Sequence, residues 1–426
     1  MTALNAAILF NSTSGSDTQS SGSSAGANVY GSGASTTSAS AVVTGITTTG
    51  VQAGDLLWVQ SSSGRQFSVI ASVDSGTQVT CDDAFANTES SRTWAIGGKR
   101  ATFSGSVQIL NDAHGGWTIE TETDQTLTAQ FGGTATGSAD SLIEINCNNK
   151  TISKSYSNFW SGAMLLRNYM RIRNANIETS VSNNGIAVSQ AGSAGNSLLE
   201  NCTIGATGSG TFAYGVYGGL TCRRVSFQNI TQAVFASASC ELIECAFLSN
   251  GTGVQASHHV SAYRCLFANQ TGNGITFTSS GRYLTAQSCL FYGNGSDGIN
   301  SAGSIMTDSL GGIRDCIFVS NTGYGINYTV AGRTTLIYQN AYFGNGSGET
   351  TGINNEIDSI TLASDPFVDS AAADFNIADN AGGGATLRAN NFSLNTDTAV
   401  YPFRQYVSDA FGAGGGGAVL HPLRSN

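Results

Sequence analysis

The residues best suited to chemistry in this sequence are a set of carboxylates and a pair of adjacent histidines in its central part. Two carboxyl groups held about 5–9.5 Å apart can cleave a glycosidic bond, and their separation decides between retention and inversion. His258 and His259, close to Tyr263, are suited to act as a base or to contact a sugar. The candidate catalytic residues are therefore Glu200, Glu241, Glu244, Asp297, Asp308, Asp315 and His258.

The composition argues against metal, nucleic-acid and membrane chemistry. The nine cysteines and four histidines lack the spacing of a zinc site, so we expect no metal and no cofactor. The formal net charge is −10, and no run of basic residues occurs. Because phosphate backbones and anionic membranes attract clustered Lys and Arg, we expect neither as a partner. The sequence also predicts no transmembrane segment and no signal peptide.

The elements that must position these residues form a repeat of roughly 20–27 residues. In each unit a small apolar residue is followed two positions later by a large one, and this period of two predicts short strands with one buried face. Such units stack about 4.8 Å apart, so each column becomes a ladder. The small-residue column contains Ala175, Cys202, Val225, Cys245, Cys265, Cys289, Cys316 and Ala341. The large-residue column contains Ile177, Ile204, Phe227, Phe247, Phe267, Phe291, Phe318 and Phe343.

Two further columns complete each unit. A recurring Asn follows the strand, where a tight turn needs a residue that tolerates left-handed backbone angles. A small residue followed by Val or Ile then starts the next strand, as in Gly253-Val254 and Gly274-Ile275. The recurring Asn residues are Asn229, Asn250, Asn269, Asn294, Asn321 and Asn345.

These columns, over about residues 165–360, resemble the coils of the right-handed parallel β-helix, or pectate-lyase-like, superfamily. The resemblance implies an all-β solenoid, with weaker units at 115–131 and 141–153. We expect a β-helix over 104–376, a small N-terminal β head over 1–103, and a C-terminal cap with a Gly-rich tail over 377–426. Residues 55–85 are expected to form a hairpin within the head, because apolar residues alternate through Leu57 and Val59 and again through Phe67 and Val69.

Two strings in the head, GRQFSVIASVD and WAIGGKRATF, resemble sequences of virion-associated proteins of bacteriophages and prophages. The resemblance implies that residues 1–103 attach the chain to another virion protein. A cap over the first coil is the alternative, since every solenoid needs one. We therefore expect a virion location, with assembly in the host cytoplasm.

The outward-facing columns indicate what surrounds the predicted solenoid. Arg224, Glu244 and Arg264 alternate in sign on successive coils and are expected to form a structural charge ladder. An outward apolar column must be shielded from water, either by a second copy of the chain or by its own C-terminal segment. We favour a homotrimer whose interface contains Leu266, Leu290, Ile317 and Tyr342. The stacked cysteines are expected to be buried thiols rather than disulfides.

Two functions fit this sequence. The first is a structural virion protein of a tailed phage (a tail spike, a fibre, or a head fibre or other capsid-decorating protein) whose β-helix contacts the host surface, with a surface polysaccharide as the candidate partner. The second is a carbohydrate-active enzyme, a polysaccharide lyase or hydrolase, in which Tyr263, Tyr324 or Tyr328 forms a sugar platform. The coils lack the polygalacturonase-type motifs, and no lysine follows Lys154 to serve as a lyase base. We favour the first function.

Overall fold

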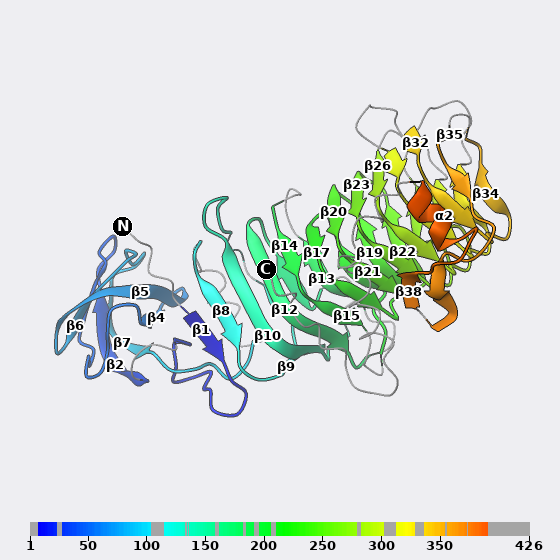
Figure 1. Cartoon of the computed structure of the whole chain (residues 1–426). Coiled ribbons are helices and arrows are strands. Elements are labelled where there is room, and N and C mark those ends of the chain that lie inside the picture. Colours follow the sequence, from blue (N-terminus) through cyan, green and yellow to red (C-terminus); the bar gives the residue numbers. More distant parts are fainter. Residues whose placement is uncertain are drawn as a thin grey trace. The chain divides into compact units, whose positions relative to one another are not determined.

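The computed structural model describes residues 7–23, 28–103, 115–132, 134, 136–157, 162–181, 185–190, 196–205, 210–278, 283–301, 312–328, 336–353, 356–372 and 374–390. The chain divides into two compact units (Figure 1). The first comprises Met1–Tyr156, Ser161–Ile177 and Ala191–Leu198. The second comprises Ser157–Trp160, Glu178–Gln190 and Leu199–Asn426. Candidate residue Asp308 lies outside the described residues.

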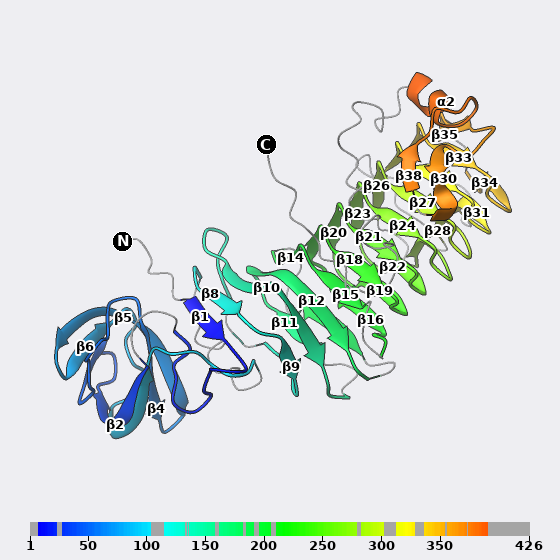
Figure 2. The ribbon, with the colours of Figure 1, turned by 60° about the horizontal axis from the view of Figure 1, so that its bottom comes forward.

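A small closed β-barrel forms much of the first unit (Figure 2). Its strand order is β2-β3-β6-β5-β4-β7, with antiparallel pairing throughout. Val43, Leu57, Ile70 and Trp94 are among the apolar side chains that fill its interior. The expected hairpin is confirmed as β4 and β5. The strands are β2 (Val29–Thr36), β3 (Val42–Thr44), β4 (Leu56–Ser61), β5 (Gly64–Ser75), β6 (Gln78–Cys81) and β7 (Glu89–Ile96).

Parallel strands follow the barrel in the same unit. Ile8 of the N-terminal strand lies opposite Ile119, which in turn lies opposite Ile145. The segment expected as a head therefore also supplies a strand to a parallel coil. These strands are β1 (Ala7–Phe10), β8 (Thr118–Thr121), β9 (Gln125–Leu127), β10 (Ile143–Lys154), β11 (Met164–Leu166) and β12 (Met170–Thr179).

The second unit is a solenoid of parallel strands, which confirms the expected β-helix. Each coil contributes two short strands to one sheet and one strand to a second sheet. The first sheet contains β14 (Leu198–Glu200), β15 (Thr203–Gly205), β17 (Thr221–Arg223), β18 (Ser226–Gln228), β20 (Cys240–Ile243), β21 (Ala246–Leu248), β23 (Val260–Tyr263), β24 (Leu266–Ala268), β26 (Leu284–Gln287), β27 (Leu290–Tyr292), β29 (Gly312–Arg314), β30 (Ile317–Val319), β32 (Leu336–Tyr338), β33 (Ala341–Phe343), β35 (Glu356–Ile357) and β36 (Ile360–Thr361). The second contains β13 (Ile186–Gln190), β16 (Tyr214–Tyr217), β19 (Gln232–Ala236), β22 (Thr252–Ala256), β25 (Ile275–Phe277), β28 (Ile299–Ser301), β31 (Tyr324–Tyr328) and β34 (Gly348–Thr351).

An aromatic ladder runs through the core of this unit, as the large-residue column predicts. Phe247 lies opposite Phe267, and Phe267 lies opposite Phe291. Consecutive ring centroids in the ladder are 4.5–5.3 Å apart, and consecutive rings are nearly parallel. Since buried aromatic side chains contribute heavily to core stability, this row is a main component of the fold. Its members are Phe227, Phe247, Phe267, Phe291, Phe318 and Tyr342.

The last step of the predicted ladder is wrong by one residue. Tyr342, not Phe343, lies opposite Phe318, and it is fully buried instead of facing a partner chain. Ile317 lies opposite Ala341, so Asn340 takes the position assigned to Ala341, and its Oδ1 accepts the Cys316 N–H at 3.0 Å. Ala341 and Phe343 fit the small–any–large pattern of the sequence, whereas the polar Asn340 does not fit its first position. The structure selects Tyr342, whose hydroxyl donates to Glu356 Oε1 at 2.6 Å.

A polar ladder follows the aromatic one at the next turn. The Asn250 N–H donates to Gln270 Oε1 at 3.0 Å, and the Gln270 N–H donates to Asn294 Oδ1 at 3.2 Å. All three side chains are buried, so these bonds form away from water. The Asn column of the sequence mixes this buried row with the preceding position, where Asn229 and Asn269 adopt left-handed φ angles of 53° and 58°.

The small residue before each Val or Ile is required by the aromatic ladder. A Cβ atom on Gly274 would lie 2.7 Å from Cδ1 of Phe291, and one on Gly298 would lie 2.7 Å from Cδ1 of Phe318. Real Cβ atoms do not approach that closely, so a larger residue would displace the ring. Two columns that look independent in the sequence are therefore one packing unit.

The nine cysteines are all free and buried, as expected. Cys202, Cys245, Cys265, Cys289 and Cys316, with Val225 between the first two, form the inward column beside the aromatic ladder. Burial raises the pKa of Cys240 to about 12. A buried thiol that stays protonated is a poor nucleophile, so Cys240 acts as a small apolar side chain.

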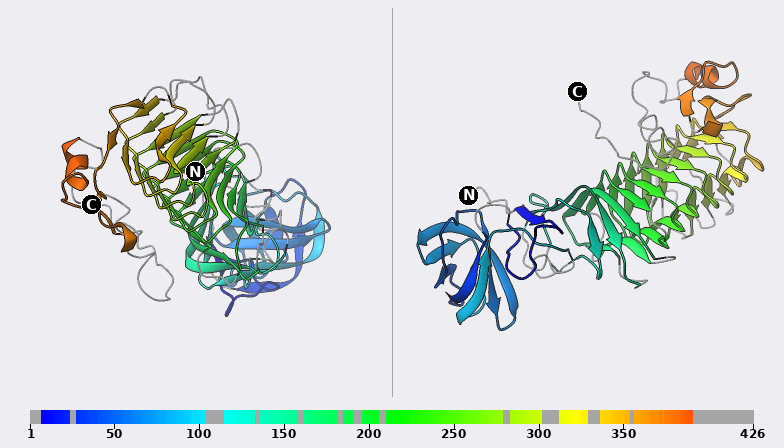
Figure 3. Two further views of the ribbon diagram at one scale, coloured as in Figure 1. Left: turned by 90° about the vertical axis from the view of Figure 1, so that its right-hand side faces the viewer. Right: turned by 90° about the horizontal axis from the view of Figure 1, so that it is seen from below.

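The predicted oligomer interface is covered by the chain itself. Leu266, Leu290 and Ile317 are 0%, 3% and 2% exposed, and they pack in one cluster with Phe367 and Leu387. Figure 3 shows this C-terminal segment beside the solenoid strands. The structure therefore matches the alternative, in which the chain's own C-terminal segment covers this face. The homotrimer stays a prediction, but these residues no longer support it. The covering elements are β37 (Phe367–Asp369), the 3₁₀ turn Ser370–Ala372, β38 (Asp374–Ile377) and α2 (Gly384–Ala389).

No helix among the described residues is both long and apolar enough to cross a membrane.

Truncating one rung of the aromatic ladder should destabilise the whole solenoid. Phe267→Ala removes a fully buried ring that stacks on both neighbours, and we expect the free energy of unfolding to fall by about 3–5 kcal/mol. Denaturant unfolding followed by circular dichroism measures this. Phe235→Ala, at a half-buried position outside the ladder, is the matched control and should cost clearly less. Equal losses for the two variants would contradict the ladder's role.

Candidate functional site

Two of the candidate carboxylates belong to a charge ladder. Glu200 Oε1 lies 2.7 Å from Arg224 Nη2, and Glu244 lies 3.9 Å from Arg224 and 3.2 Å from Arg264. Arg224, Glu244 and Arg264 all adopt left-handed φ angles, because each lies at the bend between the two strands of its coil. The ladder expected from alternating charge is confirmed, and it includes Glu200. These carboxylates are thus ionic partners of arginines.

The other carboxylates occupy separate places. Asp297 is 4% exposed and accepts hydrogen bonds from the Tyr324 N–H at 2.7 Å and from the side-chain amides of Asn300 and Asn327 at 2.6 and 2.9 Å. It therefore ties together neighbouring coils. Glu241 is exposed on β20 and accepts from Thr221 Oγ1 at 3.4 Å.

Asp315 lies at a left-handed bend, with φ of 56°. Burial raises the pKa of its carboxyl group, and the charge of Arg314 opposes that rise. Its place in the coil matches that of Arg224 and Glu244. The structure thus assigns it to a bend position rather than to a paired acid and base.

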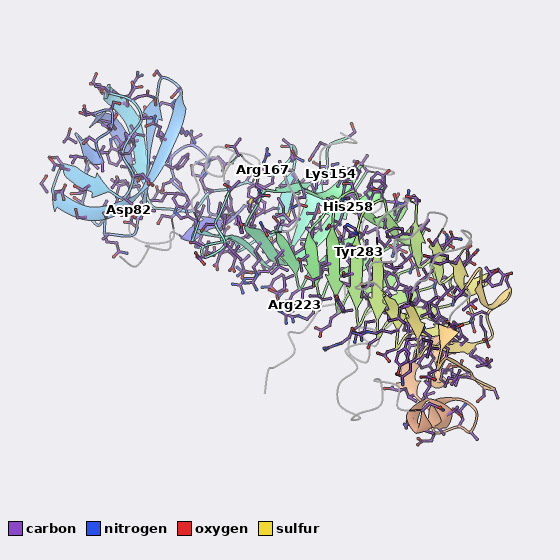
Figure 4. The ribbon with its side chains drawn as sticks, turned by 90° about the horizontal axis from the view of Figure 1, so that it is seen from above. Asp82, Lys154, Arg167, Arg223, His258 and Tyr283 are labelled. Atoms are coloured by element: carbon purple, nitrogen blue, oxygen red, sulfur yellow. The ribbon has the colours of Figure 1, made fainter. Side chains whose placement is uncertain are left out.

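The histidines lie in the turn between β22 and β23 (Figure 4). His258 Nδ1 is 3.2 Å from Ser239 Oγ. The His259 ring stacks on Tyr283 with centroids 3.6 Å apart, and its Nδ1 accepts the Tyr283 N–H at 3.1 Å. Stacking and hydrogen bonding between coils account for both residues. The candidates therefore divide into the Glu200–Glu244 pair around Arg224 and isolated positions elsewhere.

A row of uncharged side chains on the outer face of the second sheet is the best candidate for ligand contact. We call it the amide–aromatic row. Its members are half-buried and lie opposite one another on successive strands, so they form one continuous strip. They are Tyr217, Phe235, Gln255, Thr276, Asn300 and Asn327.

An aromatic cluster marks one end of this row. The rings of Tyr217 and Phe235 stack with centroids 5.1 Å apart, and Tyr214 meets both of them edge-on. Half-buried aromatic faces can pack against the apolar face of a sugar ring, while amides and hydroxyls both donate and accept hydrogen bonds. The strip therefore suits an uncharged, hydroxyl-rich ligand.

The sequence carries a pattern that marks this row, although the sequence analysis did not predict the row. Each member directly follows the inward Val or Ile that starts a strand, as Tyr217 follows Val216 and Asn300 follows Ile299. Of the expected sugar platform, Tyr263 and Tyr324 are half-buried, but Tyr328 is only 3% exposed. Tyr328 is therefore a core residue, because its strand position points inward.

Lys154, the last lysine of the chain, is buried. Its Nζ lies 4.7 Å from the centroid of the Tyr156 ring, and burial lowers the pKa of its ammonium group to about 8. It does not face solvent as a lyase base would. Within the described ranges, no group of three or more His, Cys, Asp or Glu is placed to hold a metal ion.

Residues 210–362 match the family model described as "right handed beta helix region". Together with the parallel register of the strands, this match identifies the fold of the second unit as a right-handed parallel β-helix. No curated protein matches the sequence.

Similar solved structures include the catalytic domain of a GH87 alpha-1,3-glucanase in complex with tetrasaccharides. It is 8% identical with a TM-score of 0.31, and the match covers 79% of this chain and 88% of that chain. Another is the tailspike protein gp49 from Pseudomonas phage LKA1, which is 12% identical with a TM-score of 0.23. That match covers 80% of this chain and 62% of the tailspike.

Removing the central arginine of the charge ladder should destabilise the coil. Arg224→Met leaves the buried carboxylate of Glu200 without its 2.7 Å partner, and we expect a loss of about 1–3 kcal/mol in the free energy of unfolding. Arg264→Met is the matched control, because its side chain is 57% exposed and such pairs contribute about 1 kcal/mol or less. Denaturant unfolding compares them. A larger loss for Arg264→Met would refute the assignment.

The buried lysine predicts a pH dependence of stability. Since its folded pKa of about 8 lies below the ordinary 10.5, the unfolded chain binds the proton more tightly between these values. Stability should therefore rise with pH from about 8 towards 10. Lys154→Met should remove that rise, whereas Lys150→Met, on the same strand β10, should keep it. Unfolding curves at pH 8, 8.75 and 9.5 measure the slope, and equal slopes in all three proteins would exclude the effect.

Proposed function

We propose that this chain is a structural virion protein of a tailed bacteriophage, a spike, fibre or capsid-decorating protein whose β-helix is a rigid rod. The main support is the unbroken core of the second unit, where aromatic and amide ladders run coil on coil. A side chain that packs against its counterparts above and below resists bending and local opening. Such a core suits a protein that must survive outside a cell.

The barrel supports the same proposal. The first string that resembles virion-associated proteins, residues 64–74, forms most of β5. The second string, residues 94–103, begins in β7 and continues beyond the barrel strands. The barrel has a core of its own, distinct from the coils. We assign it the attachment to another virion protein, with the coils as the part that projects.

The roles of the candidate acids also favour a structural function over a hydrolytic one. Glu200 and Glu244 neutralise arginines, and Asp297 holds a turn through three hydrogen bonds. These three carboxylates thus each have structural partners. Contact with the host then falls to the amide–aromatic row, which fits a neutral surface polysaccharide.

Particle composition tests the virion assignment. Phage particles induced from the strain that carries the gene should contain this chain when purified on a density gradient and analysed by mass spectrometry. Antibodies against the barrel and against the coils should both label intact particles in immunogold microscopy, with the coil label further from the particle body. Particles that lack the chain would refute the proposal. Release of reducing sugar from host polysaccharide by the purified chain would favour the enzymatic alternative.

The host contact has its own test. Tyr217→Ala/Phe235→Ala removes the stacked pair, and we expect retention of the chain on immobilised host polysaccharide to fall at least tenfold. Tyr30→Ala, an exposed tyrosine on β2 of the barrel, is the control and should bind like the native chain. Undiminished retention of the double variant, with its fold intact by circular dichroism, would rule out this surface.

A further inference from the structure

Three large apolar side chains near the C-terminal end of the solenoid face outward. Leu336 is 53% exposed, Tyr338 is 36% exposed and Ile357 is 46% exposed. They lie on neighbouring strands, since Tyr338 of β32 is opposite Ile357 of β35 and Leu336 is two residues away on β32. We call them the terminal patch. Clustered apolar side chains in contact with water indicate a surface that something covers.

The outward face of the second strand of each coil, across the bend from the terminal patch, is already covered from within the chain. Residues 367–387 pack over Leu266, Leu290 and Ile317, which are almost fully buried as a result. Tyr292 and Phe375 continue this contact edge-on, with ring centroids 5.0 Å apart. The chain therefore uses its C-terminal part to shield outward apolar positions of the first sheet.

The end of this covering segment is next to the terminal patch. The Gln339 side chain donates from Nε2 to the backbone oxygen of Asn390 at 3.2 Å. Gln339 directly follows Tyr338, so the described structure stops beside the patch. The segment that follows Asn390 therefore begins next to the terminal patch.

The sequence after Asn390 contains apolar and aromatic residues that could cover the terminal patch. Residues 391–426 lie outside the described residues, and they include Tyr401, Phe403, Tyr406, Val407 and Phe411. An extended chain spans about 3.3–3.6 Å per residue, so the eleven residues from Asn390 to Tyr401 can reach roughly 36 Å. The aromatic residues are thus within reach of Leu336, Tyr338 and Ile357.

From these observations we infer that the terminal patch is the docking site of residues 391–426 of the same chain. Tyr401 to Phe411 supply the apolar contacts, and the docked segment extends the cover that residues 367–387 begin. This shields the last coils in a single chain, without a second copy. The inference is independent of the virion role proposed above.

Photo-crosslinking tests the docking in the full-length protein. Tyr338 is replaced by benzoylphenylalanine, and the same replacement at Tyr30, which is 53% exposed on the barrel, serves as the control. After irradiation at low protein concentration, we expect crosslinked peptides that join position 338 to residues 391–426 within one chain. Position 30 should give no such peptide. Crosslinks from position 338 to a second chain, or to neither, would overturn the inference.

Limited proteolysis gives a second, independent measurement. Trypsin can cut after Arg404, inside the segment proposed to dock. In Leu336→Ser/Tyr338→Ser/Ile357→Ser we expect that cut to be at least tenfold faster than in the native chain, because the segment has lost its site. Tyr30→Ser/Val73→Ser changes exposed apolar residues of the barrel and should leave the rate unchanged. Equal rates in the native chain and the triple variant would contradict the docking.

Discussion

Stacking of like side chains at the coil spacing is the constraint on which this structure depends. A parallel register places Phe on Phe and amide on amide, so each residue must suit its own coil and the coils on both sides. The effect extends between columns. Gly274 is small because the ring of Phe291 passes over it, and Arg224 serves two carboxylates because these lie on the coils before and after it.

The sequence was sufficient to predict the solenoid because its columns repeat the same chemistry many times. Six aligned units make the aromatic ladder unambiguous in the middle, where Phe247, Phe267 and Phe291 have the predicted register. At the end of the repeat the columns are less regular. Tyr342 and Phe343 are both large and adjacent, and only the stacked coils show that Tyr342 is the ring that packs on Phe318.

The outward positions were harder to predict, since a column shows that a side chain faces out but not what meets it there. Leu266 and Leu290 were recognised as needing a cover, yet the segment that supplies it is about a hundred residues away and has no repeat of its own. The structural partners of the candidate acids were hard to predict for a related reason. Asp297 and Glu200 have structural partners on other coils, and those partners become visible only when the coils are stacked.

The C-terminal cover has a consequence for how long the folded chain persists. A repeat in which each coil is held only by its two neighbours frays from its ends, because a middle coil cannot open without breaking contacts on both sides. Phe367, Phe375 and Leu387 lie across several coils at once and so tie the fraying end to strands further back. The rate of irreversible unfolding is then governed by the detachment of residues 367–387 from the solenoid. The long interior makes the solenoid rigid but adds little to the lifetime of the folded chain.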